Sequence, residues 1–80
     1  PEVIIADYHL DDGTGISAIN QIRGNAARNI PALIVTADRT PEIRGEAETN
    51  SIALQNKPVK PASLRAYLTR VASLIRVAAE

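Results

Sequence analysis

Hydrophobic and polar residues alternate along this chain in blocks that predict three strands. Short apolar runs bounded by turn residues occur at Val3–Ala6, Ala32–Thr36 and Ile52–Gln55. Runs of roughly four to eight apolar residues between turn signals are typical of strands that are buried on both faces. The first strand is expected over about Glu2–Ala6. Each of the three runs is followed by a polar stretch and then by a segment with helical spacing of its apolar residues.

The first helix is expected to start near Gly15, because isoleucines then recur at every third position. Arg23 and Gly24 predict its end, since a basic last turn followed by glycine is typical of a helix C-terminus. The second helix is expected to start after Thr40 as N-cap, with Pro41 at its first position, and to run to about Thr49.

The second helix should be the least firmly docked, because Ile43 is its only large apolar residue. The last helix is expected to start near Pro61. It carries apolar residues spaced three and four apart, which form one continuous face: Leu64, Tyr67, Leu68, Val71, Leu74 and Ile75.

Strands that alternate with helices predict an α/β fold with a parallel sheet and right-handed crossovers. Three parallel strands make a thin sheet, so the apolar edge at Val3–Ala6 should be exposed unless another strand pairs with it. We expect self-association through this edge or through the face of the last helix. The chain starts at Pro1 and has no methionine, which favours its being part of a longer chain.

Eighty residues allow one domain at most. Nine basic and nine acidic residues give no net charge, and without a basic stripe no direct contact with nucleic acid is expected. The absence of cysteine excludes disulfides and thiolate metal sites, and fits a cytoplasmic location. No apolar stretch reaches the roughly 20 residues that cross a bilayer, so no membrane contact is expected from this segment.

Three polar residues come at the carboxyl ends of the predicted strands, where open α/β sheets place their ligand chemistry: Asp7, Thr36 and Lys57. An aspartate can accept a phosphoryl group. A lysine would supply charge to the phosphate, a threonine hydroxyl would donate a hydrogen bond, and Mg²⁺ would bridge the oxygens. Each residue also has a structural interpretation: an Asx-turn, a strand terminus with β propensity, and a solvated lysine.

The motifs around these residues resemble those of response-regulator receiver domains of two-component systems. Asp7-Tyr-His-Leu with Gly15 resembles the phosphoacceptor loop, Ile34-Val-Thr-Ala37 the switch hydroxyl, and Asn56-Lys-Pro-Val-Lys-Pro61 the lysine–proline turn. The resemblance covers residues 1–80, and the sequences of these motifs are most similar to those of receivers attached to hybrid sensor histidine kinases. It implies a three-layer, flavodoxin-like fold, of which this chain is similar to the last three βα units, a C-terminal partial domain.

The resemblance implies a role in a His-to-Asp phosphorelay for each matching position. Asp7 would take the phosphoryl group from a histidine kinase or phosphotransfer protein, and its carboxylate and the carbonyl of His9 would hold Mg²⁺. Thr36 would turn toward the phosphate, Lys57 would contact it, and the Lys57–Pro58 bond would be cis. The receiver itself would be a switch and not a turnover enzyme, within a parent protein of the hybrid-kinase type.

Departures from the family pattern leave two alternatives open. The family's first two strands, which carry an acidic pair for the metal, have no counterpart here, and Leu54 stands where many members have an aromatic residue. The chain would then be a truncated or degenerate receiver that acts only through protein contacts. The third hypothesis, a haloacid-dehalogenase-type phosphohydrolase, needs an aspartate two residues after the nucleophile, where this chain has His9.

Overall fold

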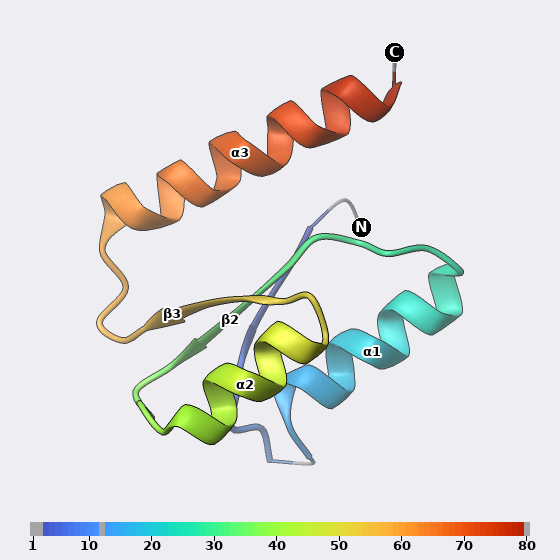
Figure 1. The fold of residues 1–80 in the computed structure, drawn as a ribbon. Helices are drawn as coiled ribbons and strands as arrows, with labels where there is room; N and C mark the ends of the chain where they lie inside the picture. The colour runs from blue at the N-terminus through green and yellow to red at the C-terminus, as the bar shows by residue number, and fades with distance from the viewer. Residues whose placement is uncertain (1–2, 12, 80) are drawn as a thin grey trace.

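The computed structural model describes residues 3–11 and 13–79, and for residues 74–79 it describes the backbone alone. Strands and helices alternate in the order β1 (Ile4–Asp7), α1 (Gly15–Ala26), β2 (Ala32–Thr36), α2 (Pro41–Thr49), β3 (Ala53–Asn56) and α3 (Pro61–Ala79). The strands form one parallel sheet in the order β1-β2-β3. Figure 1 shows this sheet between α3 on one face and α1 and α2 on the other. The predicted α/β class, parallel sheet and three layers are confirmed.

The larger core lies between the sheet and the helices α1 and α2. Because successive strand residues point to opposite faces, alternate positions of each strand enter this core. It contains Ile4 from β1, Ile34 from β2, and Ile16 and Ile19 from α1, all of them buried. The isoleucine spacing that predicted α1 therefore marks the face that covers the sheet.

The smaller core lies on the other face of the sheet, under α3. Leu33 of β2 packs there against Tyr67 and Val71 of α3, and all three are buried. Leu68, which the sequence places on the same apolar face, is 38% exposed. The side chains of Leu74 and Ile75 lie outside those that the structure describes. No helix within the described residues is long and apolar enough to cross a membrane.

The predicted end of α1 at Gly24 is wrong. The helix continues to Ala26, and Ala27 takes the left-handed conformation that closes it, with φ of 56°. The amide of Ala27 donates to the carbonyl of Gly24 over 3.2 Å. Glycine is the residue that usually occupies this left-handed position, so the sequence pointed to Gly24, three residues too early.

The outer strands are each displaced by one residue from their predicted ends. β1 extends to Asp7, where Ala6 was expected to be its last residue, and Glu2 at its predicted start lies outside the described residues. β3 begins at Ala53, because the amide of Ile52 donates to the carbonyl of Ala47 over 2.9 Å and so belongs to the turn after α2. β2 has its predicted bounds.

The helix α2 starts at Pro41 and ends at Thr49, as predicted. Thr40 occupies the N-cap position, but its side chain makes no capping hydrogen bond. Its amide donates instead to Oδ1 of Asp38 over 3.1 Å. Within α2, Ile43 and Ala47 are the buried residues. The helix is therefore held to the sheet by little apolar surface, which agrees with its weakly amphipathic sequence.

Candidate functional site

The carboxyl ends of the three strands meet at one pocket. The register places Asp7 opposite Val35 and Thr36 opposite Asn56, so the residues at and after these positions lie along one edge of the sheet. The pocket has a volume of about 210 Å³ and is lined by Asp7, Tyr8, His9, Val35, Thr36, Ala37 and Lys57. The structure thus brings together the three residues that the sequence selected for chemistry.

Asp7 and Lys57 form an ion pair at the mouth of this pocket. Nζ of Lys57 lies 2.5 Å from Oδ1 of Asp7, and the two side chains are 48% and 49% exposed. An ion pair between half-exposed groups contributes little to stability, typically about 0–1 kcal/mol. The arrangement therefore leaves a carboxylate that is open to a reagent and already faces a cation.

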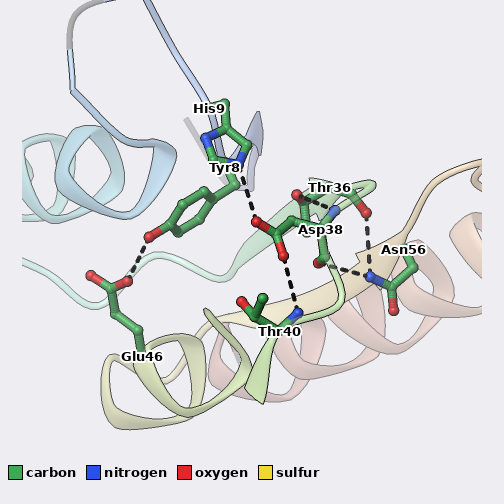
Figure 2. A network of polar contacts seen from close by, with 7 residues as sticks. All are labelled: Tyr8, His9, Thr36, Asp38, Thr40, Glu46 and Asn56. Carbon is green, nitrogen blue, oxygen red and sulfur yellow. Dashed lines mark hydrogen bonds and ion pairs between the residues drawn. The ribbon is translucent and has the colours of Figure 1, made fainter. Parts of the chain in front are cut away.

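Thr36 lies deeper than Asp7 and is 3% exposed. Its Oγ1 accepts a hydrogen bond from the amide of Asp38 over 3.0 Å. Its carbonyl accepts from the amide of Lys57 over 2.9 Å and from Nδ2 of Asn56 over 3.3 Å. The same Asn56 amide group lies 3.4 Å from the carbonyl of Asp38. These contacts fix the segment that leaves β2, and Figure 2 shows those among Thr36, Asp38 and Asn56.

The loop after Asp7 turns back on itself before α1 begins. The amide of Leu10 donates to the carbonyl of Gly13 over 3.3 Å, and Gly13 has a φ of 95° that favours glycine. Thr14 caps α1, because its Oγ1 accepts from the amide of Ser17 over 3.2 Å. The helix N-terminus is thereby placed close behind the strand end that carries Asp7.

Gly15 allows this close approach. Its amide donates to the carbonyl of Tyr8 over 2.7 Å. A Cβ at position 15 would overlap the backbone carbonyl oxygen of Asp7 and lie 2.6 Å from Cδ1 of Ile34. Gly15 is therefore needed because it has no side chain, and not for an unusual backbone angle.

The side chain of His9 faces solvent and is 69% exposed. It also reaches the loop after β2, which the sequence did not predict: Nε2 lies 3.6 Å from Oδ2 of Asp38. The hydrogen bond from the Thr40 amide is the main cause that lowers the pKa of Asp38 below its ordinary value. Asp38 is thus held on two sides, by Thr40 and by His9 (Figure 2).

Tyr8 was also missed by the sequence interpretation. Its hydroxyl donates to Oε1 of Glu46 over 2.9 Å, and this bond is the main cause that raises the pKa of Tyr8 above its ordinary value. Its ring meets that of His9 edge to face, with centroids 4.9 Å apart. No pattern in the sequence could have identified this contact, because nothing in the sequence pairs Tyr8 with a residue 38 positions later.

Other predictions about the site divide into those that the structure confirms and those that it leaves as predictions. The Lys57–Pro58 peptide bond is cis, as predicted. Leu54 stands at the position where many receivers have an aromatic residue, and its side chain packs against the larger core. Within the described residues, no three histidine, cysteine or acidic side chains lie together in a way that could hold a metal ion. The metal role of Asp7 and of the His9 carbonyl remains a prediction.

Comparison with known proteins gives likenesses in structure alone. No family model matches the chain, and no curated protein matches it. A crystal structure of the chemotaxis protein CheY4 from Vibrio cholerae is similar over 88% of this chain and 60% of its own, with a TM-score of 0.74 and 28% identity.

A DNA-binding response regulator of the LuxR family, from Staphylococcus aureus, gives the same result. It is similar over 89% of this chain and 59% of its own, with a TM-score of 0.75 and 28% identity. The chain thus spans about three fifths of the length of either structure. Both likenesses cover nearly all of a chain whose strand ends converge on Asp7, Thr36 and Lys57, and together they support a receiver domain with the flavodoxin-like fold.

Proposed function

We propose that this chain is a phosphoacceptor, with Asp7 as the residue that receives the phosphoryl group. One observation supports this most directly: a solvent-accessible carboxylate lies against a lysine ammonium in a pocket that Thr36 also lines. Phosphoryl transfer depends mainly on positioning and on stabilisation of charge, which these groups supply. The likeness to a chemotaxis protein and to a response regulator supports the same role.

The donor in this proposal is a phosphohistidine of a histidine kinase or phosphotransfer protein. An oxygen of Asp7 forms the new bond to phosphorus while the bond from phosphorus to the histidine nitrogen breaks, and the imidazole leaves with a proton from water. Lys57 then moves from the carboxylate to a phosphoryl oxygen, and the hydroxyl of Thr36 donates to another. Histidine kinases use cytoplasmic ATP, so we propose that this chain lies in the cytoplasm, or on the cytoplasmic side of the membrane if it is part of a hybrid kinase.

The residues at the pocket fit a partly hydrated Mg²⁺. Asp7 offers a carboxylate oxygen that Lys57 does not occupy, and His9, which also lines the pocket, offers a carbonyl. Mg²⁺ usually keeps several waters and takes one or two carboxylates together with phosphoryl oxygens. When bound, it would neutralise charge on the transferred group. With this small ligand set among the described residues, we expect weak affinity in the absence of the phosphoryl group.

Intact-mass measurement after incubation with acetyl phosphate and Mg²⁺ tests the proposal. The unaltered chain should gain one phosphoryl group, and Asp7→Asn should gain none, because an amide is not a nucleophile toward phosphorus. Asp11→Asn is the matched control, since Asp11 is an exposed carboxylate in the same loop, and it should label like the unaltered chain.

Labelling of Asp7→Asn at the level of the unaltered chain would contradict the proposal. A folded chain that gains no adduct would favour the alternative, a receiver that acts only through protein contacts. Turnover of small phosphoesters would favour the phosphohydrolase alternative. That alternative has no support at position 9, where an exposed histidine contacts Asp38 and no carboxylate is available as general acid.

We also propose that two copies associate through the free edge of the sheet or through the outer face of α3. Among the strands that the structure describes, β1 has β2 as its only neighbour, and Ile5 of β1 is 46% exposed. An open apolar groove of about 480 Å³ runs along α3 and includes Leu64 and Leu68. Exposed strand edges pair readily with other strands.

Light scattering on the unaltered chain should therefore give the mass of a dimer. Ile5→Lys should shift it to the monomer if the strand edge is the contact, and Leu68→Lys should do so if the contact is the face of α3. Both positions are already exposed, so neither change should unfold the chain. A monomer at every concentration would refute self-association.

A further inference from the structure

Tyr8 connects the strand that carries Asp7 with the helix α2. Neighbouring residues of an extended strand point to opposite faces, so the side chain of Tyr8 points away from that of Asp7. It packs with Ile4 and Ala6 on the face covered by α1 and α2. Its hydroxyl reaches Glu46 in the second half of α2 over 2.9 Å, as Figure 2 shows.

The other attachments of α2 are a small apolar surface and, at its C-cap Asn50, hydrogen bonds from α1: Arg23 donates to the carbonyl of Asn50 over 2.7 Å and Asn20 to its Oδ1 over 3.0 Å. Ile43 and Ala47 are its buried residues, and its N-cap threonine makes no side-chain capping hydrogen bond. At its start it depends on Asp38, which accepts from the Thr40 amide and contacts His9. A helix with so little buried apolar surface belongs to the part of a fold that opens at low free-energy cost.

The two residues that follow Asp7 therefore contact one weakly docked helix and the loop that precedes it. His9 contacts Asp38 just before α2, and Tyr8 contacts Glu46 within it. The amide of Asp38 also donates to Oγ1 of Thr36 over 3.0 Å. If the hydroxyl of Thr36 turned to a phosphoryl group on Asp7, this contact would weaken, and the loop before α2 would lose one of its attachments.

We propose that the hydrogen bond from Tyr8 to Glu46 is a latch that holds α2 against the acceptor strand. Tyr8 is thus a positioning residue: it sets how readily α2 departs when the loop at Asp38 is released. The regulatory part of this inference rests on the proposed phosphoacceptor role of Asp7. Leu54, half-buried against the same core, has no polar group with which to make such a link.

Amide hydrogen exchange of α2, measured by NMR on the unphosphorylated protein, tests the latch. Tyr8→Phe keeps the ring in its core contacts and removes only the hydroxyl. A single hydrogen bond to a charged group changes an opening equilibrium by about three- to tenfold or more. We therefore expect α2 amides from Gly45 to Thr49 to exchange about three- to tenfold faster, while those of α1 keep their rates.

Variants of Glu46 separate the latch from a general loss of structure. Glu46→Ala should accelerate α2 as Tyr8→Phe does, and the double variant should be no faster than either single one, because both changes remove the same bond. Glu46→Gln retains an acceptor oxygen and should restore slow exchange. Glu48→Ala is the matched control, since it removes an exposed carboxylate two positions away on the same helix.

Equal α2 rates in Tyr8→Phe and the unaltered protein would overturn the proposal, as would additive effects of the two single changes. Equal acceleration of α1 and α2 would also overturn it, because Tyr8 would then support the core in general. The intact-mass assay at Asp7 is independent of these rates. A missing adduct with a responsive α2 refutes the phosphoacceptor role alone, and an adduct with an unresponsive α2 refutes the latch alone.

Discussion

Replacement of Gly15 by alanine is expected to destabilise the fold by about 3 kcal/mol or more, a value at or above the upper end for overpacked sites. The added Cβ would meet the backbone carbonyl oxygen of Asp7 and the side chain of Ile34. Backbone in a buried strand cannot move aside as a flexible side chain can. A domain of this size has a total stability of only about 4–12 kcal/mol, so much of the fold should be lost.

Urea unfolding followed by circular dichroism measures this effect, with Gly24→Ala as the matched control. Gly24 lies in the same helix, and a Cβ there would meet nothing within 4 Å. Alanine should stabilise that position by about 0.5–1 kcal/mol, because glycine is unfavourable in a helix interior. Opposite signs for the two substitutions are expected. A Gly15→Ala protein as stable as the unaltered one would show that β1 and α1 can separate without cost.

Replacement of Arg23 by alanine is expected to give the second largest loss, about 2–3 kcal/mol. The guanidinium of Arg23 is half-buried and donates to the carbonyls of Ile30 over 2.8 Å, of Asn50 over 2.7 Å and of Ser51 over 3.1 Å. It thus joins the end of α1 to the segments before β2 and β3. Hydrogen bonds to a charged donor contribute about 1.5–3 kcal/mol each, and water can replace some of them at this depth.

Two further variants make the Arg23 measurement specific. Arg23→Lys should recover only part of the stability, because one ammonium group cannot match the planar fork of five N–H donors. Arg44→Ala, at an exposed position on α2, should change the unfolding free energy by less than about 0.5 kcal/mol. An Arg23→Ala protein that unfolds at the same urea concentration as Arg44→Ala would contradict a structural role for these hydrogen bonds.

Local signals in the sequence were sufficient for most of the fold. A continuous apolar run after Pro31 predicted β2 with its observed bounds, and Thr40 before Pro41 predicted the start of α2. Strand alternation with helices fixed the parallel order, and parallel order brings the strand ends to one edge. The convergence of Asp7 with Thr36 and Lys57 followed from that topology alone.

The contacts that the sequence did not predict join residues far apart in the chain. Arg23 was interpreted as a basic last turn, yet its partners lie 7, 27 and 28 positions later. Tyr8 and Glu46 meet because α2 lies over the face of the sheet to which Tyr8 points. Such pairs depend on how helices sit on the sheet, and hydrophobic periodicity gives the face of an element but not its angle or translation.

The walls of the pocket that contains Asp7, Thr36 and Lys57 have a consequence for how such a domain can diverge. Within the described residues, all seven lining positions belong to strands or to the segments that directly follow them, and none lies in a helix. Substitutions on the outer surfaces of α1, α2 and α3 can therefore accumulate while the pocket is preserved. A lineage can acquire new binding surfaces by changing its helices, and the carboxylate of Asp7 and its pocket remain a constant part shared by all of them.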